Sequence, residues 1–451
     1  MTFQSLNPYT GELYFKRSFL SSSELNGKLT ETEKLFHKWK QVPISQRVDI
    51  IRPIASYLRE HVDDLALHIT REMGKPIIES KAEIQKCALL VDYYIEEAPH
   101  TLQPETETIE GIEQGVRRDP TGAVLGVMPW NFPFWQVFRF VIPSILAGNV
   151  TLLKHAPNMP ATAEKIEDLI LETTGHRLLT QLTIGVDSIS SVLDHPIVRG
   201  ACLTGSFQAG QSYASEAGQR IIPTVLELGS NDPFVILADA DVEAACDSFL
   251  ESRFGNTGQT CIAAKRLIVE QPVYDQVETL LLERIQKLAV QDPMKESTDL
   301  SCMAREDLAQ QLESQWEESV AAGGEVLIQP EREGTRFSPG FLRKPALDSP
   351  AWIDELFGPV AVIRSAPDMS KAVQMANDTR FGLGASVWTS DLKKARDLIA
   401  GLDFGTVVVN QKTASDPRWP FGGFKDSGYG RELGKEGLLE FVNLKTYKID
   451  L

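Results

Sequence analysis

Cys261 lies where the sequence best suits nucleophilic chemistry. It ends the run Gly255-Asn-Thr-Gly-Gln-Thr-Cys261, a loop of small and hydrogen-bonding residues. Backbone N–H groups in such a loop can stabilise both a thiolate and a developing oxyanion. A lone cysteine is more often an inert core residue. We interpret the remaining cysteines in that way, since none follows a comparable loop: Cys87, Cys202, Cys246 and Cys302.

Two further polar side chains are expected at the ends of apolar strands. The segment Pro129-Trp-Asn-Phe-Pro133 follows one strand, and its rigid turn would present the Asn131 amide as a donor to an oxyanion. The segment Val225-Leu-Glu-Leu-Gly-Ser230 places Glu227 at an apolar strand end. A buried carboxylate there must be paired, or have a raised pKa that suits general-base work. Each residue alone also fits a purely structural role.

A phosphate-binding segment is expected between a strand and a helix. The run Thr204-Gly-Ser-Phe-Gln-Ala-Gly210 has small residues where a helix begins, and the N-terminus of a helix suits a pyrophosphate. Lys154 ends a neighbouring strand, where a cation could reach a ribose or a phosphate. Taken singly, both signals are weak, because such patterns are common and a lysine at a strand end is usually solvated.

The elements that would position these residues alternate between apolar strands and helices. Helical periodicity over 28–71 and 76–97 is followed by predicted strands at 123–128, 150–153, 181–184, 198–203 and 223–228, with helices at 134–147, 160–173 and 207–219. The alternation then restarts, with strands at 233–237, 266–270, 360–364, 384–388 and 406–409 and helices at 241–254, 273–289, 370–376 and 391–400. This order predicts two doubly wound α/β units with a cleft between them, and ligands at carboxyl ends of strands. Segments 101–120 and 441–449 are predicted to form strands outside both sheets.

Composition and charge exclude several classes of function. The chain has 451 residues, about three times a ~150-residue domain, so two or three units are expected. A net charge of −17 argues against nucleic-acid and membrane-surface binding. Five scattered cysteines and an N-terminus that does not resemble a signal peptide predict a cytoplasmic protein. The apolar stretch between Asp119 and Lys154 is broken by prolines and contains Arg139, so we expect buried core rather than a membrane span.

No metal site is predicted. The sequence has no His-Glu-x-x-His, no Cys-x-x-Cys, no Walker A motif and no Gly-x-Gly-x-x-Gly after a strand, and its seven histidines are dispersed.

Taken together, the motifs resemble those of the aldehyde dehydrogenase superfamily. They occur in the family's order over essentially the whole chain: Pro129-Trp-Asn-Phe-Pro133, Leu153-Lys-His-Ala156, Leu203-Thr-Gly-Ser206, Leu226-Glu-Leu-Gly229, Gly258-Gln-Thr-Cys261, Glu355-Leu-Phe-Gly-Pro359 and Pro420-Phe-Gly-Gly-Phe-Lys-Asp-Ser-Gly-Tyr-Gly-Arg-Glu432. The short length resembles that of the compact bacterial succinate-semialdehyde dehydrogenases.

The resemblance implies roles for single residues. Cys261 would attack the aldehyde carbon as a thiolate, with the Asn131 side chain and the Cys261 backbone N–H holding the oxyanion. Glu227 would activate the water that hydrolyses the resulting thioester. The cofactor, NAD or NADP, would contact residues at the matching positions, with Glu355 meeting the nicotinamide ribose: Trp130, Lys154, Gly205, Ser206, Glu355 and Phe357.

The resemblance also implies a domain organisation. Residues 1–100 and 121–228 would form a cofactor-binding domain and residues 229–430 a catalytic domain. Residues 101–120 and 431–451 would form a small β oligomerisation domain, giving a homodimer or homotetramer.

The substrate would be a short aldehyde with a distal carboxylate. Arg139 is a lone charge in an apolar stretch, and a buried Arg is costly unless an anion pairs with it. Its position resembles the carboxylate-binding Arg of succinate-semialdehyde dehydrogenases, and Ser415 resembles their carboxylate-binding Ser. The alternative is an internal ion pair for Arg139, which would leave glutarate semialdehyde or an uncharged aldehyde as the substrate.

Four positions depart from the family pattern or bear on cofactor choice. Gly255 stands where some members have a second carboxylate-binding Arg, and Ser230 where a second Gly is usual. Ala263 stands where redox-regulated relatives can have a second cysteine, so a disulfide switch with Cys261 is excluded. Pro157 replaces the acid with which NAD-selective relatives bind the ribose diol, so we expect NADP to be accepted as well as NAD. A non-catalytic protein of this fold and a cofactor-free cysteine hydrolase remain as less favoured alternatives.

Overall fold

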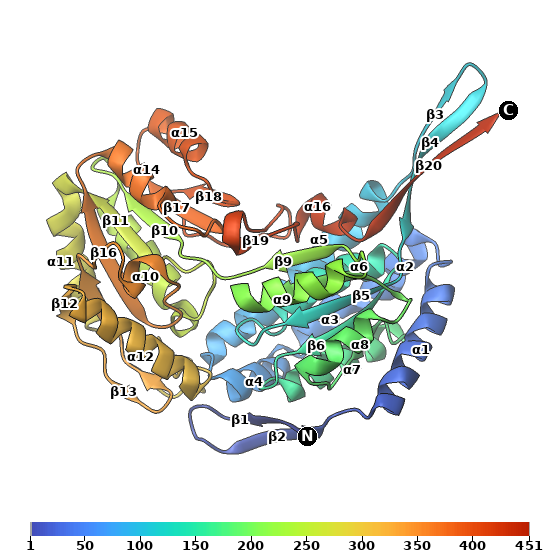
Figure 1. The fold of residues 1–451 in the computed structure, drawn as a ribbon, viewed down its shortest axis with the longest axis horizontal. Coiled ribbons are helices and arrows are strands. Elements are labelled where there is room, and N and C mark those ends of the chain that lie inside the picture. The colour runs from blue at the N-terminus through green and yellow to red at the C-terminus, as the bar shows by residue number, and fades with distance from the viewer. Residues whose placement is uncertain (1, 451) are drawn as a thin grey trace.

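The computed structural model describes residues 2–450 and has two α/β domains side by side (Figure 1). A six-stranded sheet has the order β19-β9-β8-β5-β6-β7, and a seven-stranded sheet has the order β12-β15-β16-β11-β10-β17-β18. The α/β class with two doubly wound units, as predicted from the sequence, is confirmed.

The six-stranded sheet is built on five parallel strands, with a short strand, β19, antiparallel at its edge. Its strands are β5 (Ala123–Met128), β6 (Val150–His155), β7 (Leu179–Gln181), β8 (Val198–Thr204), β9 (Thr224–Glu227) and β19 (Gly428–Tyr429). Every residue of β6 is buried, as expected for a parallel strand covered on both faces. The strand order reverses between β5 and β8, so the loops that follow these two strands border the same crevice.

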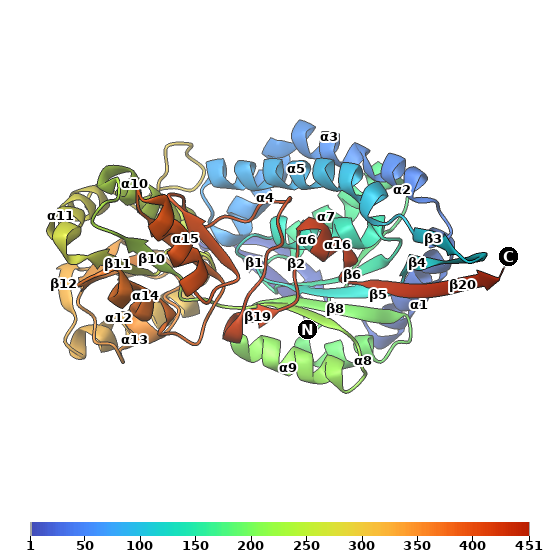
Figure 2. The same cartoon turned by 90° about the horizontal axis from the view of Figure 1, so that it is seen from above.

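Helices cover both faces of this sheet. The N-terminal helices are α1 (Ser22–Trp39), α2 (Ile44–Ile51), α3 (Pro53–Glu60), α4 (Val62–Met73) and α5 (Ile77–Thr101), and the connecting helices are α6 (Trp135–Leu146), α7 (Pro160–Thr174), α8 (Ile189–Leu193) and α9 (Phe207–Gly218). Figure 2 shows α8 and α9 on one side of the sheet and α5 on the other. All residues of α6 are buried, which confirms that the apolar stretch around Arg139 is core.

The seven-stranded sheet is parallel except for β12. Its strands are β10 (Pro233–Ile236), β11 (Arg266–Glu270), β12 (Glu325–Ile328), β15 (Gly340–Arg343), β16 (Val360–Ala366), β17 (Gly384–Trp388) and β18 (Thr406–Val409). Its helices are α10 (Val242–Phe254), α11 (Tyr274–Ile285), α12 (Glu306–Ala321), α13 (Pro350–Ile353), α14 (Met369–Asn377) and α15 (Leu392–Gly401).

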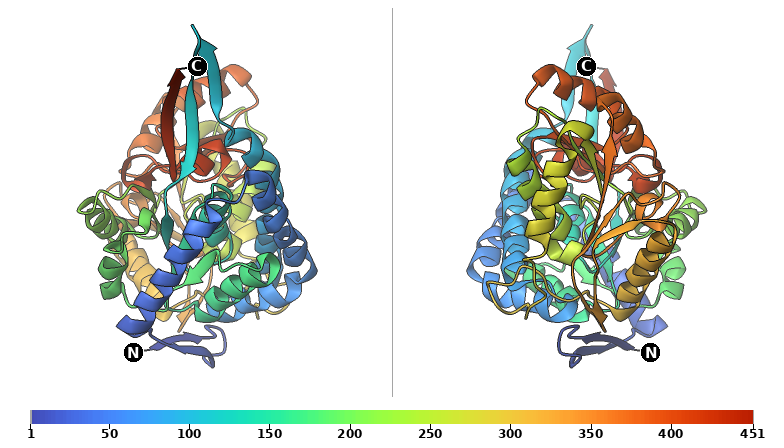
Figure 3. Two further views of the ribbon diagram at one scale, coloured as in Figure 1. Left: turned by 90° about the vertical axis from the view of Figure 1, so that its right-hand side faces the viewer. Right: turned by 90° about the vertical axis from the view of Figure 1, so that its left-hand side faces the viewer.

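A third sheet stands away from both domains. It joins β3 (Glu105–Ile109), β4 (Ile112–Pro120) and β20 (Val442–Asp450) in the order β20-β4-β3. Strand β20 follows the short helix α16 (Gly434–Leu439). Figure 3 shows this three-stranded arm projecting from the body, on the side opposite the N-terminal hairpin of β1 (Thr2–Leu6) and β2 (Leu13–Ser18). The expectation that 101–120 and 441–449 form strands outside both sheets is confirmed.

Some expected element boundaries were wrong. The strand expected at 181–184 is β7 at Leu179–Gln181, and the helical region 28–71 divides into four helices between Ser22 and Met73. Helix α12, strands β12 and β15, the β1–β2 hairpin and a small hairpin of β13 (Arg332–Glu333) and β14 (Arg336–Phe337) were not predicted. Among residues 2–450, no helix combines the length and the apolar character that a membrane crossing requires.

Candidate active site

Two cavities meet at Cys261. One, of about 700 Å³, is bordered by the loops after β5 and β8, and we name it the β5–β8 cavity. The other, of about 740 Å³, is bordered by α5 and α6 together with the loop at 412–415, and we name it the α5–α6 cavity. Cys261 and Gln136 line both cavities. A thiol at such a junction can react with a molecule in one cavity while a second molecule occupies the other.

The loop before Cys261 is held in an uncommon backbone conformation. Asn256, Thr257 and Gly258 have φ angles of 54°, 54° and 72°. Non-glycine residues adopt positive φ only where their surroundings impose it, at a cost of about 1–3 kcal/mol each. A Cβ on Gly258 would lie 2.2 Å from the carbonyl oxygen of Gly358, so only glycine fits there. The structure therefore fixes the loop that carries the predicted nucleophile.

A buried guanidinium clamps the same loop. Arg253 Nη2 donates to the carbonyl oxygens of Gly258 and Gly358 at 2.8 and 2.6 Å. Burial lowers the pKa of Arg253 to about 10, which leaves it charged at neutral pH. The charged Arg253 guanidinium therefore connects the Cys261 loop to the segment before β16 by hydrogen bonds.

Burial raises the pKa of the Cys261 thiol to about 12, and the charges of Lys265 and Arg139 lower it in part. Only a small fraction is thiolate at neutral pH, so attack on an aldehyde requires a base that removes the proton.

The Asn131 amide is oriented by its hydrogen bonds. Its Oδ1 accepts from Gln136 Nε2 at 3.0 Å, and its Nδ2 donates to the Gln259 carbonyl at 3.0 Å. The backbone carbonyl of Asn131 accepts from Asn256 Nδ2 at 2.9 Å. One N–H of the Asn131 amide is left for another acceptor, which is the group an oxyanion would need. Asn131 lines the β5–β8 cavity together with Cys261.

Glu227 is buried and lies beside a second buried carboxylate. Neither of its carboxylate oxygens has a hydrogen-bond partner among residues 2–450. Burial, followed by the charge of Glu432, raises its pKa well above the usual range, while Arg139 lowers it. A carboxyl group in this state can hold a proton at neutral pH, as a general base must after it takes one. Glu227 lines neither cavity, so that role requires its side chain to turn toward Cys261.

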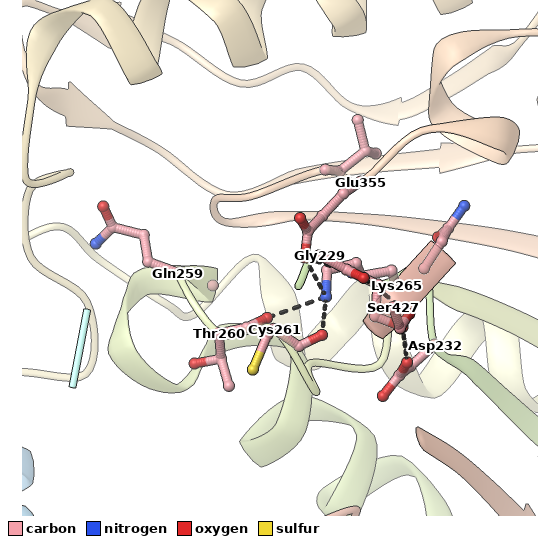
Figure 4. A network of polar contacts seen from close by, with 12 residues as sticks. Gly229, Asp232, Gln259, Thr260, Cys261, Lys265, Glu355 and Ser427 are labelled. Carbon is pink, nitrogen blue, oxygen red and sulfur yellow. Dashed lines mark hydrogen bonds and ion pairs between the residues drawn. The ribbon is translucent and has the colours of Figure 1, made fainter. Parts of the chain in front are cut away.

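A network of polar contacts links the Cys261 loop to Glu355 (Figure 4). Lys265 Nζ donates to the carbonyl oxygens of Thr260 and Cys261 and lies 3.2 Å from Glu355 Oε1. Glu355 Oε1 also accepts from the backbone N–H of Ser230 at 3.1 Å. A Cβ at Gly229 would lie 2.5 Å from Glu355 Oε2, so the absence of a side chain at Gly229 leaves room for this carboxylate. The network thus fixes the position of Glu355 relative to the nucleophile loop.

Ser230, the departure from the family pattern, takes part in this network. Its hydroxyl donates to Asp232, whose other hydrogen bond, from the Gly384 N–H, is 3.1 Å long. Burial raises the pKa of Asp232 to about 7, and the charge of Lys265 lowers it in part. Ser230 therefore donates to one oxygen of a buried carboxylate instead of lining either cavity.

The β5–β8 cavity has the parts that a dinucleotide requires. Helix α9 begins at its rim, with Ser206 as the N-cap accepting from Ala209 N–H at 3.3 Å, which leaves the first N–H groups of the helix free for a phosphate. The rings of Trp130 and Phe357 pack edge to face at 5.8 Å between centroids. Five of the six predicted cofactor positions line this cavity: Trp130, Gly205, Ser206, Glu355 and Phe357.

Lys154, the sixth position, does not line the cavity. Its ammonium lies 5.8 Å from the centroid of the Phe3 ring, and burial lowers its pKa. Its part in cofactor binding stays a prediction.

The α5–α6 cavity contains both residues predicted to bind a substrate carboxylate, Arg139 and Ser415. Arg139 has a partner within the protein, because its Nε lies 2.6 Å from Glu432 Oε2 and both side chains are buried. Ser415 Oγ accepts from Lys86 Nζ at 2.9 Å and from Trp135 Nε1 at 3.1 Å. The internal ion pair that the sequence left as an alternative is thus present in the structure.

Sequence reasoning missed several residues of the site: Lys86, Gln136, Arg253, Lys265 and Arg380. Lys265 could have been found, since it follows the predicted nucleophile by four residues, after the apolar run Ile262-Ala-Ala264. Lys86 gave no local signal, because it belongs to a long helix with charges on several sides.

The other four cysteines are buried free thiols, and no group of three or more potential metal ligands occurs in the part of the chain that the structure describes.

Residues 1–447 match the aldehyde dehydrogenase family, and the chain belongs to this family. Over 99% of both chains it is 41% identical to the probable NADP(+) succinate-semialdehyde dehydrogenase of Synechocystis sp.. It is 38% identical to the NAD(P)+ succinate semialdehyde dehydrogenase Sad of Escherichia coli K12, over 98% of this chain and 96% of that one. The crystal structure of succinic semialdehyde dehydrogenase from Streptococcus pyogenes, in complex with NADP+, superposes with a TM-score of 0.96 at 33% identity over 99% of each chain.

Proposed function

We propose that the protein oxidises succinate semialdehyde to succinate with NAD or NADP. The observation that carries this proposal is the place of Cys261 at the junction of two cavities. One cavity suits a dinucleotide, and the other contains Arg139, Ser415 and Lys86 together with Cys261. The full-length relatives whose names state this activity support the same substrate.

The first step forms a bond between Cys261 Sγ and the aldehyde carbon. The thiol proton passes to water, the carbonyl π electrons move to oxygen, and an oxyanion results. The free N–H of the Asn131 amide and the backbone N–H of Cys261 are the donors proposed for that oxyanion. Because Asn131 Oδ1 is held by Gln136, its amide group presents N–H rather than oxygen.

The second step leaves a thioester on Cys261. A bound nicotinamide cofactor would supply the acceptor for the hydride of the former aldehyde carbon, and the residues that would hold it are Trp130, Ser206, Glu355 and Phe357. Glu227 then takes a proton from a water molecule that attacks the thioester carbon. The C–S bond breaks, the carboxylic acid leaves, and Glu227 returns the proton to the sulfur, which restores the Cys261 thiol and the Glu227 carboxylate.

The cofactor choice follows from what lies near the predicted ribose position. Pro157 provides no carboxylate that would repel a 2′-phosphate, and Lys154 is three residues before it. We expect NADP and NAD both to support turnover. An NADP efficiency below about 1% of the NAD value, a gap of ~2.7 kcal/mol, would contradict this.

An assembly of two or four copies through the three-stranded arm is part of the proposal. The arm has two open edges, at β3 and β20, which could pair with a strand of another copy.

Five free cysteines without a disulfide suit a reducing compartment such as the cytoplasm.

The test is turnover of a matched pair of four-carbon aldehydes, with formation of NAD(P)H followed by absorbance. Succinate semialdehyde and butyraldehyde differ in the distal carboxylate, and each is measured with NAD and with NADP. Cys261→Ala serves as the inactive control. We expect a preference for succinate semialdehyde that disappears with the thiol.

A second candidate substrate class is favoured by one observation, the ion pair between Arg139 and Glu432. If that pair persists during turnover, Arg139 does not serve a substrate carboxylate, and an uncharged aldehyde would suit the cavity. Butyraldehyde turnover at or above that of succinate semialdehyde would favour this second candidate.

A further inference from the structure

Lys86 is the cation of the α5–α6 cavity that has no carboxylate partner. It lies on α5 with its Nζ 2.9 Å from Ser415 Oγ and 4.3 Å from the centroid of the Trp135 ring. Among residues 2–450, no carboxylate oxygen lies within 4.0 Å of this ammonium. Lys86 is partly exposed and lines the cavity, so a carboxylate that enters the cavity would meet an ammonium that no internal acid already pairs.

The other cations of this cavity are each neutralised. Arg139 pairs with Glu432 at 2.6 Å, and Lys412 pairs with Glu251 at 2.8 Å. The buried Lys75 pairs at 2.5 Å with Glu83, which lines the cavity. Among residues 2–450, Lys86 is therefore the cation in the cavity lining that has no carboxylate within 4.0 Å.

The hydrogen bonds of Ser415 point to the same conclusion. A serine hydroxyl can accept two hydrogen bonds and donate one. Lys86 Nζ and Trp135 Nε1 occupy both acceptor positions, at 2.9 and 3.1 Å. In the described part of the chain no acceptor receives the Ser415 O–H, so this donor is free for a ligand. An ammonium and a hydroxyl donor side by side suit a group that only accepts hydrogen bonds, which a carboxylate does.

We propose that Lys86, with the hydroxyl of Ser415, binds the distal carboxylate of the aldehyde substrate. This inference rests on the proposed function and changes its carboxylate site, because Lys86 takes the charge-pairing role that the sequence gave to Arg139. Arg139 then acts on the buried acids, where it pairs with Glu432 and lowers the pKa of Glu227.

The charges around Lys86 make its effect depend on pH. Burial lowers its pKa to about 8, and Arg139 lowers it further, whereas Cys87, Glu83 and Asp416 raise it. A lysine is charged below its pKa, so carboxylate binding should weaken as the pH rises through about 8. A bound carboxylate favours the charged form and raises this pKa in the complex.

The experiment compares Lys86→Met and Lys86→Arg with the unmodified enzyme on succinate semialdehyde and butyraldehyde. The measured quantity is the ratio of the two kcat/KM values. For Lys86→Met we expect the ratio to fall at least tenfold, or about 1.4 kcal/mol, with most of the change in the KM of succinate semialdehyde. Lys86→Arg keeps the charge and should recover part of the ratio. Lys412→Met, which removes a paired lysine from the same cavity, should leave the ratio within threefold.

The pH profile provides an independent readout. In the unmodified enzyme the KM of succinate semialdehyde should rise above pH ~8, and in Lys86→Arg this rise should be absent, because arginine stays charged. Lys86→Gln repeats the charge removal if Lys86→Met does not fold. A ratio unchanged by Lys86→Met or Lys86→Gln overturns the assignment.

Failure of the proposed function would look different. If the unmodified enzyme itself turns over butyraldehyde as efficiently as succinate semialdehyde, the proposed substrate is wrong before any variant is measured. If the unmodified enzyme prefers succinate semialdehyde and the Lys86 variants keep that preference, the substrate stands and only the Lys86 assignment fails.

Discussion

Arg139 Nε lies 2.6 Å from Glu432 Oε2, and the two side chains are 4% and 5% exposed. This ion pair joins α6 to the segment that follows β19, so it links the core of the first domain to the returning C-terminal chain. Removing one member leaves a buried charge without a partner, which typically costs 3–5 kcal/mol.

We therefore expect Arg139→Met to lower the free energy of unfolding by about 3–5 kcal/mol and to reduce turnover of charged and uncharged aldehydes alike. Urea denaturation followed by tryptophan fluorescence measures the first effect. Arg139→Met combined with Glu432→Leu removes both charges and should recover part of the loss. The opposite result would be a free energy of unfolding lowered by less than ~1 kcal/mol, together with reduced turnover of succinate semialdehyde alone. That result would mean that Arg139 binds the substrate carboxylate directly.

Cys261 should react with a neutral alkylating agent at a rate set by its thiolate fraction. Its pKa of about 12 lies above the working range, so the rate should rise about tenfold per pH unit from pH 7 to 10 without a plateau. Iodoacetamide with a quenched activity assay measures this rate. Lys265→Met removes the charge that most lowers this pKa, so alkylation should slow at every pH. A plateau below pH 9 would show that another group stabilises the thiolate.

Glu227→Gln should slow the second half of the reaction. The amide cannot take the proton of the attacking water, so the thioester should accumulate after one turnover, with kcat reduced by about 10²–10⁴. Rapid mixing should then show a burst of NAD(P)H close to the enzyme concentration. Loss of the burst together with the steady-state rate would instead place Glu227 in the first step, as the base for Cys261.

Gly229→Ala should disturb Glu355 selectively. The new Cβ would lie 2.5 Å from Glu355 Oε2, so the carboxylate must move away from Ser230 N–H and Lys265. We expect the KM of the cofactor to rise several-fold while folding is retained. Gly218→Ala is the matched control, because a Cβ there meets no atom within 4 Å. Equal cofactor KM values in the two variants would show that Glu355 does not contact the cofactor.

Much of this fold can be predicted from local sequence. Strands buried on both faces form short apolar runs, and the predicted ranges 123–128, 266–270, 384–388 and 406–409 agree with β5, β11, β17 and β18. Helix α12 was missed because only a narrow stripe of it is buried, at Ala309, Leu312, Trp316 and Ser319, in an otherwise polar segment.

The site was only partly predictable for a different reason. Cys261, Asn131 and Glu227 lie in local motifs, where a loop or strand end shows what the side chain could do. Which charge neutralises which depends on contacts between segments distant in sequence, as in Arg139 with Glu432 and Lys86 with Ser415. No periodicity or spacing records such pairs. The proposed substrate site therefore depends on long-range pairing, whereas the proposed nucleophile could be found from a local motif.

The three-stranded arm carries an exposed apolar face that an assembly would cover. Strand register places Ile109 opposite Ile112, and Leu444 shares their face through its pairing with Arg118. Their exposed fractions are 48%, 37% and 62%. Leu444→Glu should therefore yield smaller species by light scattering at concentrations where the unmodified protein is assembled. Leu13→Glu is the control, because Leu13 is 57% exposed on the distant N-terminal hairpin. An unchanged mass for Leu444→Glu would mean that this face of the arm does not mediate assembly.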